Sequence, residues 1–200
     1  TVSGGGYFGS YVDFEGSIKT EVDLIHKYRD MANHAECEQA IDDITNDTII
    51  YDDTRKSVSV ILDEVDLPDT IKNKITTEFD EILKLLHFKR RGYEIFRKWY
   101  IDGKLYFHII LDEKTSKKGI SELRPIDSTK IRKVRKVNKG RNPTGSIDTQ
   151  LVDSIEEFYV YSDQSHNSNS TEGLRIALDS ISYNHSGLYA SSKKRVIGYL

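Results

Sequence analysis

Residues 93–137 constrain the fold more than any other stretch of this chain. An aromatic-rich segment with helical spacing ends at Asp102-Gly103, and an alternating, largely apolar strand over residues 104–112 follows at once. After a turn rich in Lys and Gly, residues 120–126 are expected to pair back antiparallel, and the chain then becomes densely basic. Such a block builds a sheet layer and a charged surface but gathers no set of catalytic side chains. It therefore favours a protein that assembles or binds over an enzyme.

Helical periodicity predicts that helices dominate the first half of the chain. Ser17 is a suitable N-cap for a first helix, and a second amphipathic pattern follows it. The sequence Asp66-Leu67-Pro68-Asp69 is a helix-start signal and precedes a clear amphipathic helix. We expect Gly92 to separate this third helix from the aromatic-rich one that ends at Asp102-Gly103.

Runs of β-branched and aromatic residues predict further strands. These strands are expected at residues 57–63, 156–162, 174–178 and 181–183. Two segments lack such runs. Residues 138–150 indicate a loop, and residues 162–172 predict a mobile loop because none of their side chains is aliphatic or aromatic. Helices followed by strands make the expected fold class α+β.

The chain is expected to fall into three consecutive regions. Residues 1–16 are rich in Gly with interspersed aromatics, which predicts a flexible or extended arm able to add a strand to a neighbour. Residues 17–112 predict a helical region that includes the first two expected strands. Residues 113–200 predict a β-rich region that contains the basic segment 130–141.

The charges are distributed unevenly although the net charge is only −3. The acidic patch, taken from a stretch without Lys or Arg, comprises Asp30, Glu36, Glu38, Asp42, Asp43 and Asp47. The basic patch, taken from a stretch without carboxylates, comprises Lys130, Arg132, Lys133, Arg135, Lys136, Lys139 and Arg141. Interleaved apolar residues let this stretch pack as a strand or short helix with its cations in solvent. These cations are predicted either to meet an acidic partner, such as the acidic patch of the same chain or of another subunit, or to contact nucleic-acid phosphates.

The candidate catalytic and metal-binding residues are few. His34 and Cys37 are spaced for two metal ligands on one helix face, but no second pair lies near them in the sequence. Paired acids such as Asp42 and Asp43 are typical of a solvated helix face, and neither a Walker lysine nor a Gly-x-Ser-x-Gly turn is present. We therefore expect no enzyme activity, no cofactor and no metal.

Cellular location is constrained by two further observations. Cys37 is the only cysteine, which excludes an internal disulfide and favours a reducing compartment. No run approaches the ~20 apolar residues of a membrane span. The stretch Val196–Leu200 is apolar, and we expect the chain to be a fragment whose missing part covers it.

Several motifs resemble the portal vertex protein of T4-like tailed bacteriophages, in the same order from about Ser17 onward. The strongest is the block WYIDGKLYFH followed by ELRPIDSTKIRKVRK, and ISYNHSGL follows later. Chains of that family are much longer. The resemblance implies that this chain forms the outer wing and part of the inner portal of a subunit. It also implies that channel-lining helices and a crown follow Leu200.

The resemblance also implies a function. Portal subunits form a closed ring, typically a dodecamer, that replaces one capsid pentamer at a unique vertex. They are expected to nucleate head assembly with scaffold and major capsid protein, dock the large terminase, bind neck proteins and conduct double-stranded DNA. The location is then the virion, and the host cytoplasm during assembly. Two alternatives stay open, a monomeric nucleic-acid-binding module using residues 130–141, and a phage nuclease using Asp42 or Asp43 with Mg²⁺.

Overall fold

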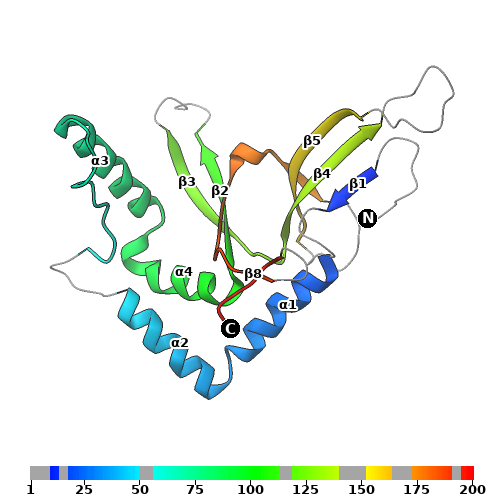
Figure 1. Ribbon diagram of the computed structural model, residues 1–200, viewed down its shortest axis with the longest axis horizontal. Helices are drawn as coiled ribbons and strands as arrows, with labels where there is room; N and C mark the ends of the chain where they lie inside the picture. Colours follow the sequence, from blue (N-terminus) through cyan, green and yellow to red (C-terminus); the bar gives the residue numbers. More distant parts are fainter. Residues whose placement is uncertain are drawn as a thin grey trace.

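Among the described residues, four helices precede all but the first strand of a set of antiparallel sheets, so the expected α+β fold class is confirmed (Figure 1). The computed structural model describes residues 10–13, 18–49, 56–112, 119–139, 152–163, 173–190 and 195–200. Most of the expected mobile loop at 162–172 and most of the expected loop at 138–150 therefore lie outside the described residues, as do residues 1–9 and 14–16 of the arm and the expected N-cap Ser17. None of the described helices is long and apolar enough to cross a membrane.

The helices pack around the fourth of them. They are α1 (Ile18–Met31), α2 (Ala35–Thr48), α3 (Asp69–Leu85) and α4 (Phe88–Asp102). In Figure 1, α1 and α2 form a V beneath α4, while α3 lies above the start of α4 at the left. The buried side chains of Ala32, Ile41 and Ile101 join the end of α1, α2 and α4 in one apolar cluster. Leu200 at the end of the chain packs against this cluster. The apolar end of the chain is thus partly covered within this chain.

The break between α3 and α4 lies at His87, and the expectation that Gly92 separates them is wrong. His87 has φ 49°, a left-handed conformation that redirects the chain between two helices. Gly92 lies inside α4 and is buried, and a β-carbon there would come 3.0 Å from Cε1 of Phe88. This glycine therefore serves close packing within the helix and does not end one.

A three-stranded sheet follows α4 directly. It contains β2 (Lys104–Leu111), β3 (Ile120–Ile126) and β7 (Ile181–His185), in the order β3-β2-β7. Gly103 ends α4 with φ 73°, which confirms the turn predicted at Asp102-Gly103. The predicted antiparallel pairing also holds, with Phe107 opposite Pro125.

A second, four-stranded sheet has the order β1-β4-β5-β6. Its strands are β1 (Ser10–Asp13), β4 (Ile131–Lys139), β5 (Val152–Tyr161) and β6 (Leu174–Ile176). The strand of the predicted arm pairs with β4 of its own chain, with Val12 opposite Arg135. A third sheet pairs β8 (Tyr189–Ala190) with β9 (Arg195–Val196).

Aromatic side chains join the two larger sheets. Tyr106 of β2 is 1% exposed, stacks on Tyr183 at 4.8 Å and meets the edge of Tyr159 from β5 at 6.1 Å. Ile131 and Ile181 complete this buried cluster together with Ile176. Such pairs add about 0.5–1.5 kcal/mol beyond area burial, so Tyr106 is a principal link between the sheets.

The strand expected at residues 57–63 is absent. These residues form no regular element, and Ile61 is 77% exposed. A β-branched run becomes a strand only where a neighbouring strand offers backbone partners, and this segment instead leads to α3, where Lys56 pairs with Asp80 at 2.7 Å. A smaller correction concerns residues 174–178, because β6 ends at Ile176 and a 3₁₀ turn (Leu178–Ser180) follows.

Candidate functional site

A bidentate ion pair joins the first helix to the end of the fourth. Arg29 of α1 donates from Nε to Oδ1 of Asp102 at 2.9 Å and from Nη2 to Oδ2 at 2.7 Å. The Asp102 side chain is 1% exposed. The hydrogen bonds that Arg29 donates to Asp102 are the main cause that raises the pKa of Arg29. A buried carboxylate in this geometry depends on its guanidinium partner.

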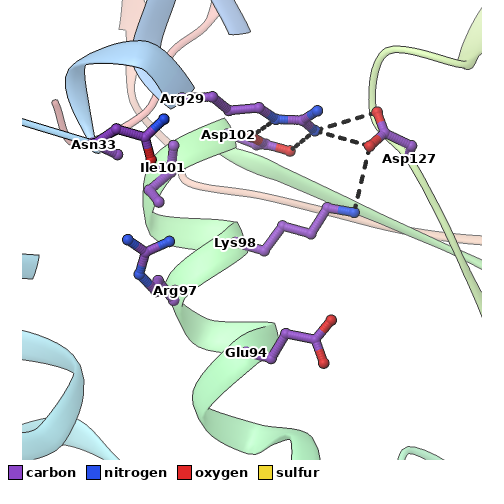
Figure 2. Close-up of a pocket in the computed structure, with 9 residues that line it drawn as sticks. Arg29, Asn33, Glu94, Arg97, Lys98, Ile101, Asp102 and Asp127 are labelled. Atoms are coloured by element: carbon purple, nitrogen blue, oxygen red, sulfur yellow. Dashed lines mark hydrogen bonds and ion pairs between the residues drawn. The ribbon is translucent and has the colours of Figure 1, made fainter. Parts of the chain in front are cut away.

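Asp127, in the turn between β3 and β4, extends this network. Its Oδ1 accepts hydrogen bonds from the backbone N–H of Thr129 at 2.8 Å, from Oγ1 of Thr129 at 2.6 Å and from Nη2 of Arg29 at 3.2 Å. Figure 2 shows the guanidinium of Arg29 lying between the two carboxylates, with Lys98 reaching Asp127 from α4 at 3.9 Å. Burial opposes ionisation of Asp127, but the hydrogen bonds from Thr129 and Arg29 outweigh it and hold its pKa well below the usual range.

The hollow around this network is balanced in charge. It has a volume of about 320 Å³, and its charged lining consists of three cations and three anions, namely Arg29, Arg97, Lys98, Glu94, Asp102 and Asp127. Since the pKa values of Arg29 and Asp127 are both shifted to favour their charged forms, neither group exchanges protons near neutral pH. The arrangement suits a rigid joint between α1, α4 and the β3–β4 turn, and it offers no poised acid, base or nucleophile.

A second charged tie fixes α1 to the sheet. Lys104 at the start of β2 donates to Glu21 of α1, and the Lys104 side chain is 3% exposed. Ser128 donates to the backbone carbonyl of Lys104 at 3.2 Å, which links this tie to the turn that carries Asp127. Sequence reasoning missed both ties, because it treated Asp102 and Lys104 only as parts of a turn and a strand.

The acidic patch covers the outward face of α2 and the end of α1. Five of its six members are exposed, namely Asp30, Glu36, Glu38, Asp43 and Asp47. Asp42 is turned toward α4, where it accepts a hydrogen bond from the Tyr93 hydroxyl at 2.6 Å and lies 3.5 Å from Nε of Arg97. That hydrogen bond raises the pKa of Tyr93.

The basic patch lies on strand β4, and one of its members is not a surface residue. Arg132 is 6% exposed, so the expectation that these cations all project to solvent is wrong for it. The alternation of a strand places Arg132 on the same face as the buried Val134. Arg141 lies outside the described residues.

Lys133 and Arg135, on the other face of β4, share one carboxylate. Nζ of Lys133 lies 2.8 Å from Oε2 of Glu157 on β5, and Arg135 donates to Oε1 of the same side chain. Hydrogen bonds from both cations lower the pKa of Glu157. The two patches occupy opposite parts of the molecule, with α2 at the lower left and β4 at the upper right of Figure 1, so the structure does not bring them together.

The remaining candidates stay apart as well. Among the residues that the structure describes, no three His, Cys, Asp or Glu side chains are grouped so as to hold a metal ion. Cys37 is half-buried on α2, with His34 at the start of that helix.

Comparison with known proteins relates the sequence of this chain to bacteriophage portal proteins. The model of the bacteriophage T4-like portal protein (Gp20) family matches residues 21–200. The portal protein of Vibrio phage KVP40 is 35% identical over 197 residues, covering 93% of this chain and 37% of the relative. The portal protein of Salmonella phage ViI is 33% identical over 161 residues, covering 80% of this chain and 28% of the relative. The chain thus spans about a third of the length of these curated relatives.

Proposed function

Since the chain belongs to the bacteriophage T4-like portal protein family, we propose that it is part of a subunit of the ring-shaped portal at the unique vertex of a phage capsid. The ring, typically a dodecamer, would form the channel through which viral DNA enters and leaves the head. The role is structural, and the protein would act in the virion after assembling in the host cytoplasm.

One observation carries this proposal. The family match extends over residues 21–200 and includes both the helices and the sheets of the fold. A match of that extent to portal proteins concerns the whole arrangement and not one motif. The charged joint at Arg29, Asp102 and Asp127 agrees with it in kind, because it ties α1 and α4 to the turn between β3 and β4.

The proposed partners follow from the same role. They are further copies of the subunit, the major capsid protein, scaffold, the large terminase, neck proteins and the DNA that passes through the channel. The acidic patch and the half-buried members of the basic patch, namely Lys130, Lys133, Arg135 and Lys136, are candidate contact surfaces for neighbouring subunits. A closed ring needs two different complementary surfaces on each subunit, and two separated patches of opposite charge are able to supply them.

The test is negative-stain electron microscopy of the full-length parent protein, with subunits counted in end-on views. We expect rings with a central opening about as wide as a DNA duplex. Single subunits that stay monodisperse over a range of salt concentrations would contradict the proposal. The next measurements would then be the salt dependence of DNA binding and metal-dependent cleavage, with Asp42→Asn and Asp43→Asn as the diagnostic variants.

A further inference from the structure

Helix α3 carries an apolar stripe that the rest of the described chain leaves uncovered. None of its residues is buried, although apolar side chains recur along it at helical spacing. Ile71, Ile75 and Ile82 lie within a narrow sector of the helix and are all exposed. A surface helix normally buries such a stripe, so this face is suited to a contact with another chain.

The same end of the molecule is net acidic. Residues 56–84 contain seven carboxylates and four lysines, two of which pair with Asp80 and Glu81, so an excess of three negative charges is left. The irregular segment before α3 adds two exposed apolar side chains, Ile61 and Val65. A partner for this end needs apolar side chains surrounded by positive charge.

The far end of the β4–β5 ribbon has those properties. Val137 and Ile155 are cross-strand partners, and Ile155 is 56% exposed. Because side chains alternate along a strand, this pair shares its face with Lys133, Arg135 and Glu157. Strands β4 and β5 together carry five cations and three carboxylates, which leaves the ribbon with an excess of two positive charges.

At the other end of the ribbon, the same face is covered. Ile131 and Tyr159 lie on the same face and are buried against Tyr106. The ribbon then continues past the three-stranded sheet, and the face emerges at Val137 and Ile155. It is an extension of a packed sheet face that lacks a cover among the described residues.

The two surfaces lie at opposite ends of the longest axis of the molecule, with α3 at the left and the ends of β4 and β5 at the upper right of Figure 1. We propose that the apolar stripe of α3 in one copy docks on the Val137–Ile155 face of the β4–β5 ribbon in the next copy. Unlike patches at opposite ends give a head-to-tail contact, which closes into a ring when the rotation per subunit allows it. The inference rests on the ring of the proposed function and names one of its contacts.

In a ring of identical subunits, charge favours the β4–β5 ribbon over α2 or a second α3 as the surface that contacts the α3 stripe. A two-fold contact between the α3 helices of two copies would bring two net acidic segments together. The outward face of α2 is also acidic, and Ile44 is the one exposed large apolar residue of α2 among those described. The head-to-tail contact instead joins the net acidic end that carries α3 to a net basic ribbon, with Glu78 beside the stripe able to approach Lys133 and Arg135.

Thiol cross-linking of the assembled full-length protein tests the contact directly. Ile75→Cys and Ile155→Cys are introduced singly and together after Cys37 and any other cysteines have been replaced by serine, and a short bismaleimide is added. We expect the double variant to give a ladder of oligomers, and a mixture of the two single variants to give dimers. Each single variant alone should stay uncross-linked, as should the cysteine-free parent.

The outcomes separate this inference from the proposed function. Intact rings without the cross-link between positions 75 and 155 would overturn the contact and leave the portal assignment standing. Cross-linking of the Ile75→Cys variant to itself would overturn it in favour of a two-fold contact. A parent protein that forms no rings would overturn both.

An assembly assay supplies an independent arm. Ile75→Asp places a charge in the stripe, whereas Asn73→Asp places the same charge on the opposite, exposed face of α3. We expect the first variant to reduce the yield of rings at least tenfold and the second to leave it unchanged. Equal yields would overturn the proposal, and circular dichroism would show that both variants stay folded, since both positions are exposed.

Discussion

Gly103 and Gly198 lie against each other where the last residues of the chain cross the end of α4. A β-carbon on Gly103 would lie 2.8 Å from the backbone nitrogen of Gly198 and 2.4 Å from the carbonyl oxygen of Ile197. One on Gly198 would lie 2.1 Å from the carbonyl oxygen of Ile101. The backbone N–H of Tyr199 also donates to the carbonyl of Tyr100 at 3.0 Å. Two glycines thus permit a backbone crossing that brings Leu200 onto the helical core.

A side chain at either glycine of this crossing should destabilise the fold. We expect Gly198→Ala to lower the free energy of unfolding by roughly 2–4 kcal/mol, because the new methyl group meets rigid backbone atoms. The measurement is urea denaturation of the 200-residue chain. Gly103→Ala should cost as much or more, since it adds strain at φ 73° to the clash.

Gly187 is the matched control for Gly103. It has φ 80°, but a β-carbon there would meet no atom within 4 Å. Gly187→Ala should therefore cost only the strain of a left-handed residue, about 1 kcal/mol. Equal losses for Gly103→Ala and Gly187→Ala would show that the crossing contributes nothing beyond backbone strain.

Removal of the guanidinium between Asp102 and Asp127 should destabilise the subunit strongly. Arg29→Ala leaves the carboxylate of Asp102 buried without its bidentate partner, and we expect a loss of roughly 3 kcal/mol in the free energy of unfolding. Arg91→Ala makes the same chemical change at an exposed pair with Glu94 and should be close to neutral. Similar urea midpoints for the two variants would mean that the joint does not hold α1 in place.

The stability of the chain should fall in acid because of Asp127. Its native-state pKa is held below the unfolded-state value of about 4, so the native state binds fewer protons than the unfolded state between these values. The contribution is therefore fully present above about pH 4 and is lost as the pH falls toward the native-state pKa. Asp127→Asn should be less stable than the wild type at pH 7, and the difference should shrink at pH 3.

Thr129→Val provides a graded control for this pH effect. It removes the side-chain hydrogen bond to Asp127 but keeps the backbone one and the ion pair with Arg29. The acid-dependent loss should then lie between those of the wild type and Asp127→Asn. Urea midpoints that fall in parallel for all three proteins would assign the acid sensitivity to other groups.

Local patterns in the sequence predicted much of the fold but not the tertiary choices. The turn at Asp102-Gly103 and the hairpin that follows it depend on neighbouring residues, and both are confirmed. The strand expected at residues 57–63 was wrong because a strand needs a partner that local composition does not reveal. The helix break expected at Gly92 was wrong for a similar reason, because this glycine makes room for the side chain of Phe88.

The tertiary contacts of the charged residues could likewise not be predicted from local patterns. Composition identified the acidic and basic patches, but only the strand register shows that Arg132 is buried while Lys133 and Arg135 share Glu157. The joint at Arg29 spans 73 residues to Asp102 and 98 residues to Asp127. No local pattern links three such distant positions, so the joint became visible only once the helices and the turn had been placed together.

Charge reversal on α3 should weaken ring assembly in a salt-dependent way. Glu78→Lys would place a cation opposite Lys133 and Arg135 of the next copy in the proposed contact, and we expect fewer rings in mass photometry of the full-length protein. Raising the ionic strength should restore part of the yield, because the Debye length shortens from about 10 Å at 0.1 M to about 3 Å at 1 M. Asn73→Lys combined with Thr77→Lys adds cations on the opposite face of α3 and should assemble normally. Loss of rings in this second variant as well would mean that assembly responds to the overall charge of α3, so the face that carries Ile75 would have no special role.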